Sequence, residues 1–90
     1  MSLYVAAYDI SESWRRERVS RVLHDFGRRV QWSVFLIPLD PDELPELRRR
    51  VGSLLALSDH FDLFPVDDRG SRRRWSWQRP PDQFEPVLLW

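Results

Sequence analysis

The feature that most constrains the fold of this chain is the uninterrupted apolar run from Leu3 to Tyr8. Its tyrosines and valine favour a β-strand, and a strand without polar positions is typical of the middle of a sheet that is covered on both faces. Asp9 ends the run. A chain of 90 residues is expected to form one domain, 1–90. Such a small domain buries only about 60% of its unfolded surface, so pairing with a second copy would add stability.

Two helices are predicted after this strand. The first covers about 12–26, and Gly27 is its expected left-handed C-terminal residue. Residues 40–43, Asp-Pro-Asp-Glu, have the composition of a helix start, and the second helix is expected to end near residue 57. Each helix has one apolar stripe at the spacing of a buried face: Val19, Val22, Leu23 and Phe26 in the first, and Leu44, Leu47, Val51, Leu54 and Leu55 in the second.

Three further strand segments are predicted, at 29–39, at 61–66 and, after a turn at 67–71, at 72–78; an apolar tail follows at 87–90. The order strand, helix, strand region, helix, strand predicts an α+β sandwich with both helices on one face of a sheet. A ferredoxin-like arrangement needs two strands between the helices. Periodicity alone does not divide the segment between them.

The charge balance does not favour a protein that simply coats nucleic acid. The formal net charge is zero, from 14 basic and 14 acidic residues, which argues against a protein that covers nucleic acid with general positive charge. All the basic residues are arginine. Guanidinium groups bind phosphate bidentately, so the exclusive use of arginine has two possible explanations: a local phosphate-binding face or a compositional bias.

Several kinds of protein are excluded or disfavoured. The sequence has no cysteine, which excludes disulfides, thiol nucleophiles and thiolate zinc sites. No apolar run approaches the ~20 residues of a membrane helix. No secretion signal is visible. We therefore expect no membrane contact and a cytoplasmic location.

Asp9 is the strongest candidate for chemistry, because ligands collect where a buried strand gives way to a helix. One carboxylate can hold Mg²⁺, which keeps several waters, and two across a two-fold axis would hold it better. The alternative is a helix N-cap without further function. His24 and His60 lie too far apart in sequence to suggest a metal or triad site, and His60 is expected in an exposed loop. The arginine clusters at 15–21, 48–50 and 72–74 are either solvated faces or phosphate-binding surfaces.

Three short segments together resemble one family. They are Tyr-Asp-Ile-Ser at 8–11, Arg-Glu-Arg-Val at 16–19 and Arg-Val-Gln-Trp-Ser-Val-Phe at 29–35. The pattern is similar to that of the small CRISPR-associated partner of the spacer integrase, a family often described as endoribonucleases and sometimes written Cas-two. The chain departs from it at Trp32, where tyrosine is usual, and at 36–38, where Leu-Ile-Pro replaces a more acidic continuation.

The resemblance implies a ferredoxin-like βαββαβ fold with an extra C-terminal strand. The segment after Gly27 would be split by a tight turn near 32–33. Two copies would form a homodimer whose sheets face each other, with residues 79–90 as a tail that docks on the partner and a strand near 87–89 joining its sheet. The resemblance also implies one Mg²⁺ ion shared between Asp9 of the two subunits.

The resemblance further implies functional residues. Those tied to catalysis are Asp9, which would also bind the metal, Tyr8, Ser33 and Phe35. Those tied to nucleic-acid binding are Arg16, Arg18 and Arg29.

The implied function is spacer acquisition in CRISPR adaptive immunity, with two alternatives for how the protein takes part. One is Mg²⁺-dependent endonuclease activity on single-stranded RNA or duplex DNA, for which the sequence offers no evident general base. The other is a structural scaffold that bridges two integrase dimers and holds a duplex by its phosphates. A toxin-like ribonuclease of related fold is a third alternative.

Overall fold

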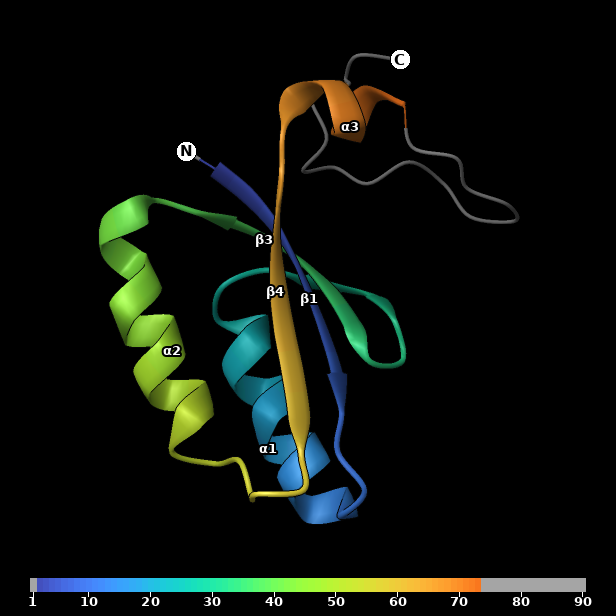
Figure 1. Ribbon diagram of the computed structural model, residues 1–90, viewed down its shortest axis with the longest axis vertical. Helices are drawn as coiled ribbons and strands as arrows, with labels where there is room; N and C mark the ends of the chain where they lie inside the picture. Colours follow the sequence, from blue (N-terminus) through green and yellow to red (C-terminus); the bar gives the residue numbers. More distant parts are fainter. Residues whose placement is uncertain (1, 74–90) are drawn as a thin grey trace.

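A four-stranded antiparallel sheet with two helices on one face forms the described part of the chain (Figure 1). The computed structural model describes residues 2–73. The strand order is β2-β3-β1-β4, with β1 and β3 inside the sheet. This arrangement confirms the predicted ferredoxin-like α+β sandwich. The elements are β1 (Ser2–Asp9), α1 (Ser13–His24), β2 (Arg28–Gln31), β3 (Val34–Leu39), the 3-10 turn η1 (Pro41–Glu43), α2 (Leu44–Gly52), β4 (His60–Val66) and α3 (Asp68–Arg72).

The central position of β1 is confirmed, because it pairs with β3 on one side and β4 on the other. Its alternate residues Tyr4, Ala6 and Tyr8 belong to the core under the helices. The intervening residues Leu3, Val5 and Ala7 are half-buried on the opposite face. The prediction that both faces are covered is thus confirmed for the face under α1 and α2, and neither of these two helices covers the apolar second face.

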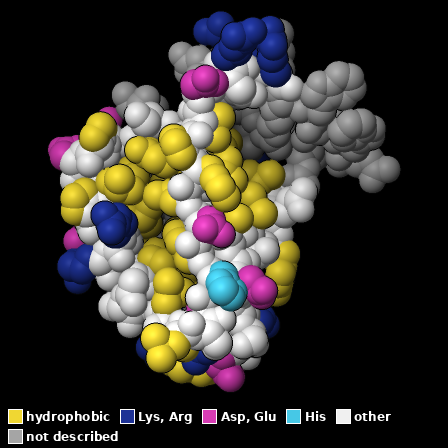
Figure 2. Space-filling model, viewed as in Figure 1, with side chains coloured by type: hydrophobic (Ala, Val, Ile, Leu, Met, Phe, Trp, Pro, Cys, Tyr) yellow, Lys and Arg dark blue, Asp and Glu magenta, His cyan; other side chains and the backbone are white. Residues whose placement is uncertain are grey.

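The core lies between the sheet and the two predicted helix stripes. Val19 and Leu23 of α1 and Leu47 and Val51 of α2 are buried against it. On the sheet side, Phe35, Ile37 and Leu39 of β3 are fully buried. Hydrophobic side chains also line a groove of about 500 Å³ between α2 and β4, where Figure 2 shows them at the surface beside the β4 edge.

The predicted split of the segment between the helices is confirmed. A two-residue turn at Trp32 and Ser33 separates β2 from β3, although it contains no glycine. The pairing of β2 with β3 shifts register between Arg29 and Gln31, which indicates a bulge beside the turn. Trp32 is 70% exposed at the tip.

The second helix is shorter than predicted. α2 ends at Gly52, and Leu54 and Leu55 reach the core from the following loop. Leu57, where the prediction ended the helix, is fully exposed. Asp59 fastens this loop to α1, since its carboxylate accepts hydrogen bonds from the Ala56 amide and from Arg15 of α1.

The predicted turn at 67–71 is also wrong, because α3 begins at Asp68. The Asp67 carboxylate accepts a hydrogen bond of 2.6 Å from the Gly70 amide, the usual way for such a residue to cap a helix start. Arg72, the first residue of the predicted strand 72–78, lies in α3. Residues 74–78 and the predicted tail at 79–90 lie outside the described residues.

Gly27 is required for a different reason than predicted. Its φ lies outside the left-handed region. A Cβ there would overlap the carbonyl oxygen of Leu36 and lie 2.8 Å from the Cα of Ile37. Glycine therefore lets the chain leaving α1 pass directly against the backbone of β3.

Candidate nucleic-acid interface

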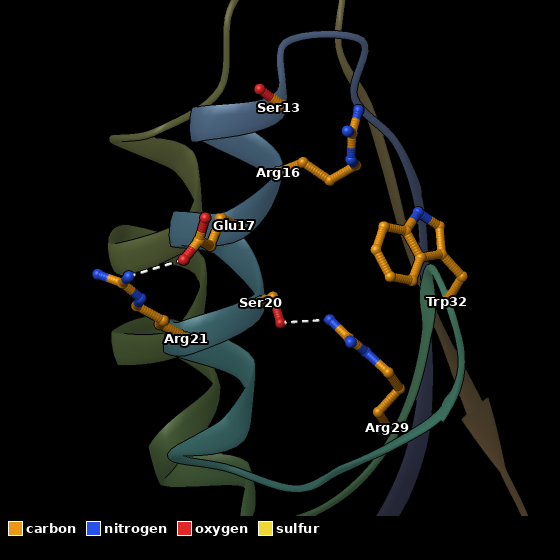
Figure 3. A pocket seen from close by; sticks show the side chains of 7 residues that line it. All are labelled: Ser13, Arg16, Glu17, Ser20, Arg21, Arg29 and Trp32. Carbon is orange, nitrogen blue, oxygen red and sulfur yellow. Dashed lines mark hydrogen bonds and ion pairs between the residues drawn. The ribbon is translucent and has the colours of Figure 1, made fainter.

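A pocket of about 450 Å³ lies between α1 and the turn that joins β2 to β3 (Figure 3). Three arginines and one exposed indole ring contribute to its wall, and Figure 3 shows Arg16, Arg29 and Trp32 in the space between the helix and the turn, whereas Arg21 points away from it toward Glu17. The lining residues are Ser13, Arg16, Glu17, Ser20, Arg21, Arg29 and Trp32.

Arg29 is held in place by one polar and two aromatic contacts. Its Nη2 donates a hydrogen bond of 2.6 Å to Ser20 Oγ, and its guanidinium lies 5.3 Å from the ring centre of Trp32 and 5.4 Å from that of Phe35. Its buried Nε has no hydrogen-bond partner among the described residues. The charge of Arg29 is thus oriented but not neutralised.

Arg16 reaches the same pocket from α1. Its Nη1 donates hydrogen bonds to the carbonyl oxygens of Ile10, at 2.9 Å, and Ser11, at 3.2 Å. One edge of this guanidinium therefore fixes the loop that follows Asp9. Within residues 2–73 no carboxylate forms an ion pair with Arg16 or Arg29, whereas Arg21 is paired with Glu17 at 2.7 Å.

Arg18 does not join this pocket. It is exposed, and its guanidinium lies 5.3 Å from the ring centre of Trp14. The 48–50 cluster is largely committed to ion pairs, because Arg49 contacts Glu46 and Arg50 contacts Asp25, both at 2.7 Å. For these two arginines the structure favours the solvated-face alternative.

Tyr8 and Phe35 are core residues beneath the pocket. Phe35 is fully buried and Tyr8 is 6% exposed, with their ring centres 6.4 Å apart. The Tyr8 hydroxyl has no hydrogen-bond partner in the described part of the chain. Ser33 is half-buried in the turn, and its carbonyl oxygen accepts a hydrogen bond from the Tyr8 amide at 3.1 Å. Phe35 therefore supports Arg29 from below, and Ser33 fastens the turn to β1.

Asp9 lies on the other face of the sheet from this pocket. It is exposed, and it follows Leu3, Val5 and Ala7 in the alternation of β1. The alternative that Asp9 caps the helix is wrong, since α1 begins at Ser13 with Glu12 as its N-cap. The register places Asp9 opposite His60.

The described residues of one chain do not form a complete metal site. Among residues 2–73 no three His, Asp or Glu side chains gather in a way that could hold an ion. His60 is exposed as predicted, but it opens β4 rather than lying in a loop.

Two features of this surface were not predicted from the sequence. Trp32 stood out only as a departure from the family pattern, and nothing in the sequence placed it against Arg29. His60 could not be set opposite Asp9, because that pairing depends on the register of β4 against β1. A signal for Trp32 was present, since a large aromatic residue at a turn tip is commonly exposed.

The described residues include no helix that is long and apolar enough to cross a membrane.

Comparison with known proteins places the chain among CRISPR proteins. The family model described as "CRISPR associated protein Cas2" matches residues 1–74. The chain is 45% identical over 65 residues to a CRISPR-associated endonuclease Cas2 of Thermus thermophilus, covering 71% of this chain and 72% of that protein. It is 33% identical over 82 residues to a CRISPR-associated endoribonuclease Cas2 of Synechocystis sp., covering 90% and 89%.

The fold agrees with solved structures. A chain in a structure described as a partial Cas6-RT-Cas1–Cas2 complex superposes with a TM-score of 0.79 at 20% identity, covering 92% of both chains. At that identity the likeness supports the fold. Together with the match of the family model to most of the chain, it leads to one assignment: this chain belongs to the CRISPR-associated protein Cas2 family.

Proposed function

We propose that two copies of this chain form a nucleic-acid-binding dimer that serves spacer acquisition in CRISPR adaptive immunity as the partner of the integrase. The single observation that carries the binding role is the pair of arginines, Arg16 and Arg29, which line one pocket without a carboxylate partner among residues 2–73. The name of the related Cas1–Cas2 complex supports an integrase as the partner.

The face of the sheet opposite the helices supports the dimer. Residues directly opposite each other in the sheet share a face, so the register defines this set, which we call the open face. Phe64 on it is 54% exposed. A contiguous apolar surface on a small chain marks an interaction site. The apolar residues of the open face are Leu3, Val5, Ala7, Val34, Pro38, Phe64 and Val66, together with Leu36, which is already buried within one chain.

A second copy stacked by two-fold symmetry is the occupant that fits best. Such an interface uses the same patch on both chains, which suits one flat, self-complementary apolar sheet face. β4, which carries Phe64 and Val66 of this face, is one of the two edge strands of the described sheet. An edge strand can take a further strand by backbone hydrogen bonds, and the partner's C-terminal strand would do so here.

Contacts to phosphate rather than to bases suit the arginine surface. Guanidinium groups on a helix face and beside a turn position a nucleic-acid backbone and carry no sequence information. The dimer would present this surface twice. Binding would then depend on duplex length and on salt more than on sequence.

Catalysis by metal-dependent phosphodiester hydrolysis is the second candidate function, and the position of Asp9 favours it. The exposed Asp9 carboxylate forms no ion pair within residues 2–73, and it lies on the open face, so dimerisation would bring two copies toward one axis. Mg²⁺ is commonly bound by one or two carboxylates with waters and substrate phosphates, so these residues fit the ion. When bound, Mg²⁺ would activate a water and offset charge on the scissile phosphate.

The binding role is tested by the salt dependence of duplex affinity. Arg16→Ala and Arg29→Ala should each reduce the slope of log affinity against log salt by about two units, because each removes one phosphate contact from both chains of the dimer. Arg49→Ala removes the same charge from an arginine that is already paired with Glu46, and it should leave the slope unchanged. Equal slopes for all three variants and wild type would contradict the proposed surface.

The catalytic role is tested separately with Asp9→Asn. We expect duplex affinity without metal to stay within about twofold of wild type, because the carboxylate lies away from the arginine pocket. Mg²⁺-dependent cleavage of labelled single-stranded RNA or duplex DNA should disappear. Cleavage that survives the substitution would remove Asp9 from the catalytic site.

A further inference from the structure

We propose that the pocket between α1 and the β2–β3 turn binds one unpaired nucleotide of a nucleic-acid strand, with its phosphate against Arg16 and Arg29 and its base stacked on Trp32. This inference rests on the proposed function, since it names the kind of strand that the arginine surface selects.

Trp32 supplies the surface for the base. Its indole is 70% exposed at the tip of the turn, and it lines the pocket. Arg29 lies 5.3 Å from the ring centre, and a single guanidinium covers only one face of a ring. The exposed part of the indole can receive a base. Stacking on an aromatic ring accepts every base, because each has a flat π surface.

The arginines supply the phosphate site. Three arginines and one glutamate line the pocket, and the ion pair between Arg21 and Glu17 leaves Arg16 and Arg29 with uncompensated charge. Arg29 is fixed by Ser20, and its buried Nε–H has no partner among residues 2–73. A guanidinium that is already held in place loses little entropy when it binds a phosphate oxygen.

The size of the pocket selects an unpaired nucleotide. Its volume of about 450 Å³ lies within the usual range for sites that enclose a small ligand, and it cannot admit a double helix. Bases in a duplex are stacked and paired, so a nucleotide must be single-stranded or flipped out before its base can reach Trp32. The arginines would still contact the phosphates of a duplex, which leaves Trp32 as the residue that distinguishes the two kinds of strand.

The test compares two ligands with wild type and Trp32→Ala. One ligand is a fully paired DNA duplex, and the other is the same duplex with one unpaired nucleotide in its centre. Loss of the indole should weaken binding of the second ligand on the order of tenfold, and binding of the first by less than about twofold. Trp32→Phe keeps a flat ring and should retain most of the preference.

Trp14→Ala is the matched control. Trp14 is also an exposed indole beside arginines, 52% exposed, but it lies outside the pocket. Its removal should leave the ratio of the two affinities unchanged. Because both indoles are exposed, thermal unfolding should confirm that neither variant is destabilised.

The outcomes separate this inference from the proposed function. An equal loss on both ligands, or no loss on either, would overturn the nucleotide pocket while duplex binding stands. Tight binding of a free mononucleotide with no preference for the unpaired strand would also overturn it. If wild type bound neither ligand, the proposed function itself would fail.

Discussion

At the scale of single residues, Asp59 joins three parts of the chain. Its carboxylate is fully buried and accepts hydrogen bonds from Arg15 Nε at 2.9 Å, from Arg15 Nη2 at 3.4 Å and from the Ala56 amide at 2.9 Å. The hydrogen bond from Arg15, followed by that from Ala56, lowers the pKa of Asp59 below its ordinary value. The loop between α2 and β4 is thereby fastened to α1.

This lowered pKa gives the stability a defined dependence on pH. The contribution is fully present above the pKa of an unfolded aspartate, about 3.9, and is lost as the pH falls through the lower pKa of the folded chain. Asp59→Asn should lower the melting temperature by several degrees at neutral pH and weaken its further decline in acid. Melting curves of both proteins at neutral and acidic pH check this.

The control is an ion pair of similar length on the surface. Glu17 and Arg21 lie 2.7 Å apart, with side chains 65% and 74% exposed. Exposed pairs of this kind contribute about 0–1 kcal/mol, so Glu17→Gln should hardly move the melting temperature. If Asp59→Asn behaved like Glu17→Gln, Asp59 would not fasten the loop.

At the scale of elements, two glycines provide matched substitutions of opposite sign. Gly27→Ala should destabilise the fold by about 1–3 kcal/mol, because the new Cβ would collide with the backbone of β3. Gly52→Ala should stabilise it by up to about 1 kcal/mol, because nothing lies within 4 Å and alanine favours the helix. Urea unfolding measures both. Equal effects would show that the chain after α1 does not pass so close to β3.

The elements themselves could largely be predicted from the sequence. The uninterrupted apolar run predicts β1, and the apolar stripes at helical spacing predict α1 and α2. The end of α2 could not, because Leu54 and Leu55 keep the helical spacing while they pack from a loop. The β2–β3 turn could not be derived from periodicity either, since it lacks a turn-forming glycine, and only the family resemblance placed it.

The candidate surface could be predicted less completely than the fold. Arg16 and Arg29 were expected to act together, and the structure brings both into one pocket. Local sequence could not show which face of β1 the helices cover, and so which of Tyr8 and Asp9 is buried, or that Arg18 lies against Trp14 instead. These relations depend on strand register and helix rotation, which long-range packing decides.

At the scale of the whole molecule, the open face governs the assembly. Phe64→Glu places a charge on it and should convert a dimer to single chains, because burying an unpaired carboxylate in an apolar interface is costly. Leu57→Glu adds the same charge at a fully exposed loop position and should leave the assembly unchanged. Light scattering after size exclusion gives the mass of each. A variant with Phe64→Glu that kept the mass of two chains would place the interface elsewhere.

Binding of nucleic acid by a two-fold dimer can be measured by native mass spectrometry of wild-type protein with a short DNA duplex. We expect a dominant complex of two chains with one duplex, which weakens when Arg16 and Arg29 are both replaced by alanine. A complex of one chain with one duplex, or no complex at low salt, would contradict it.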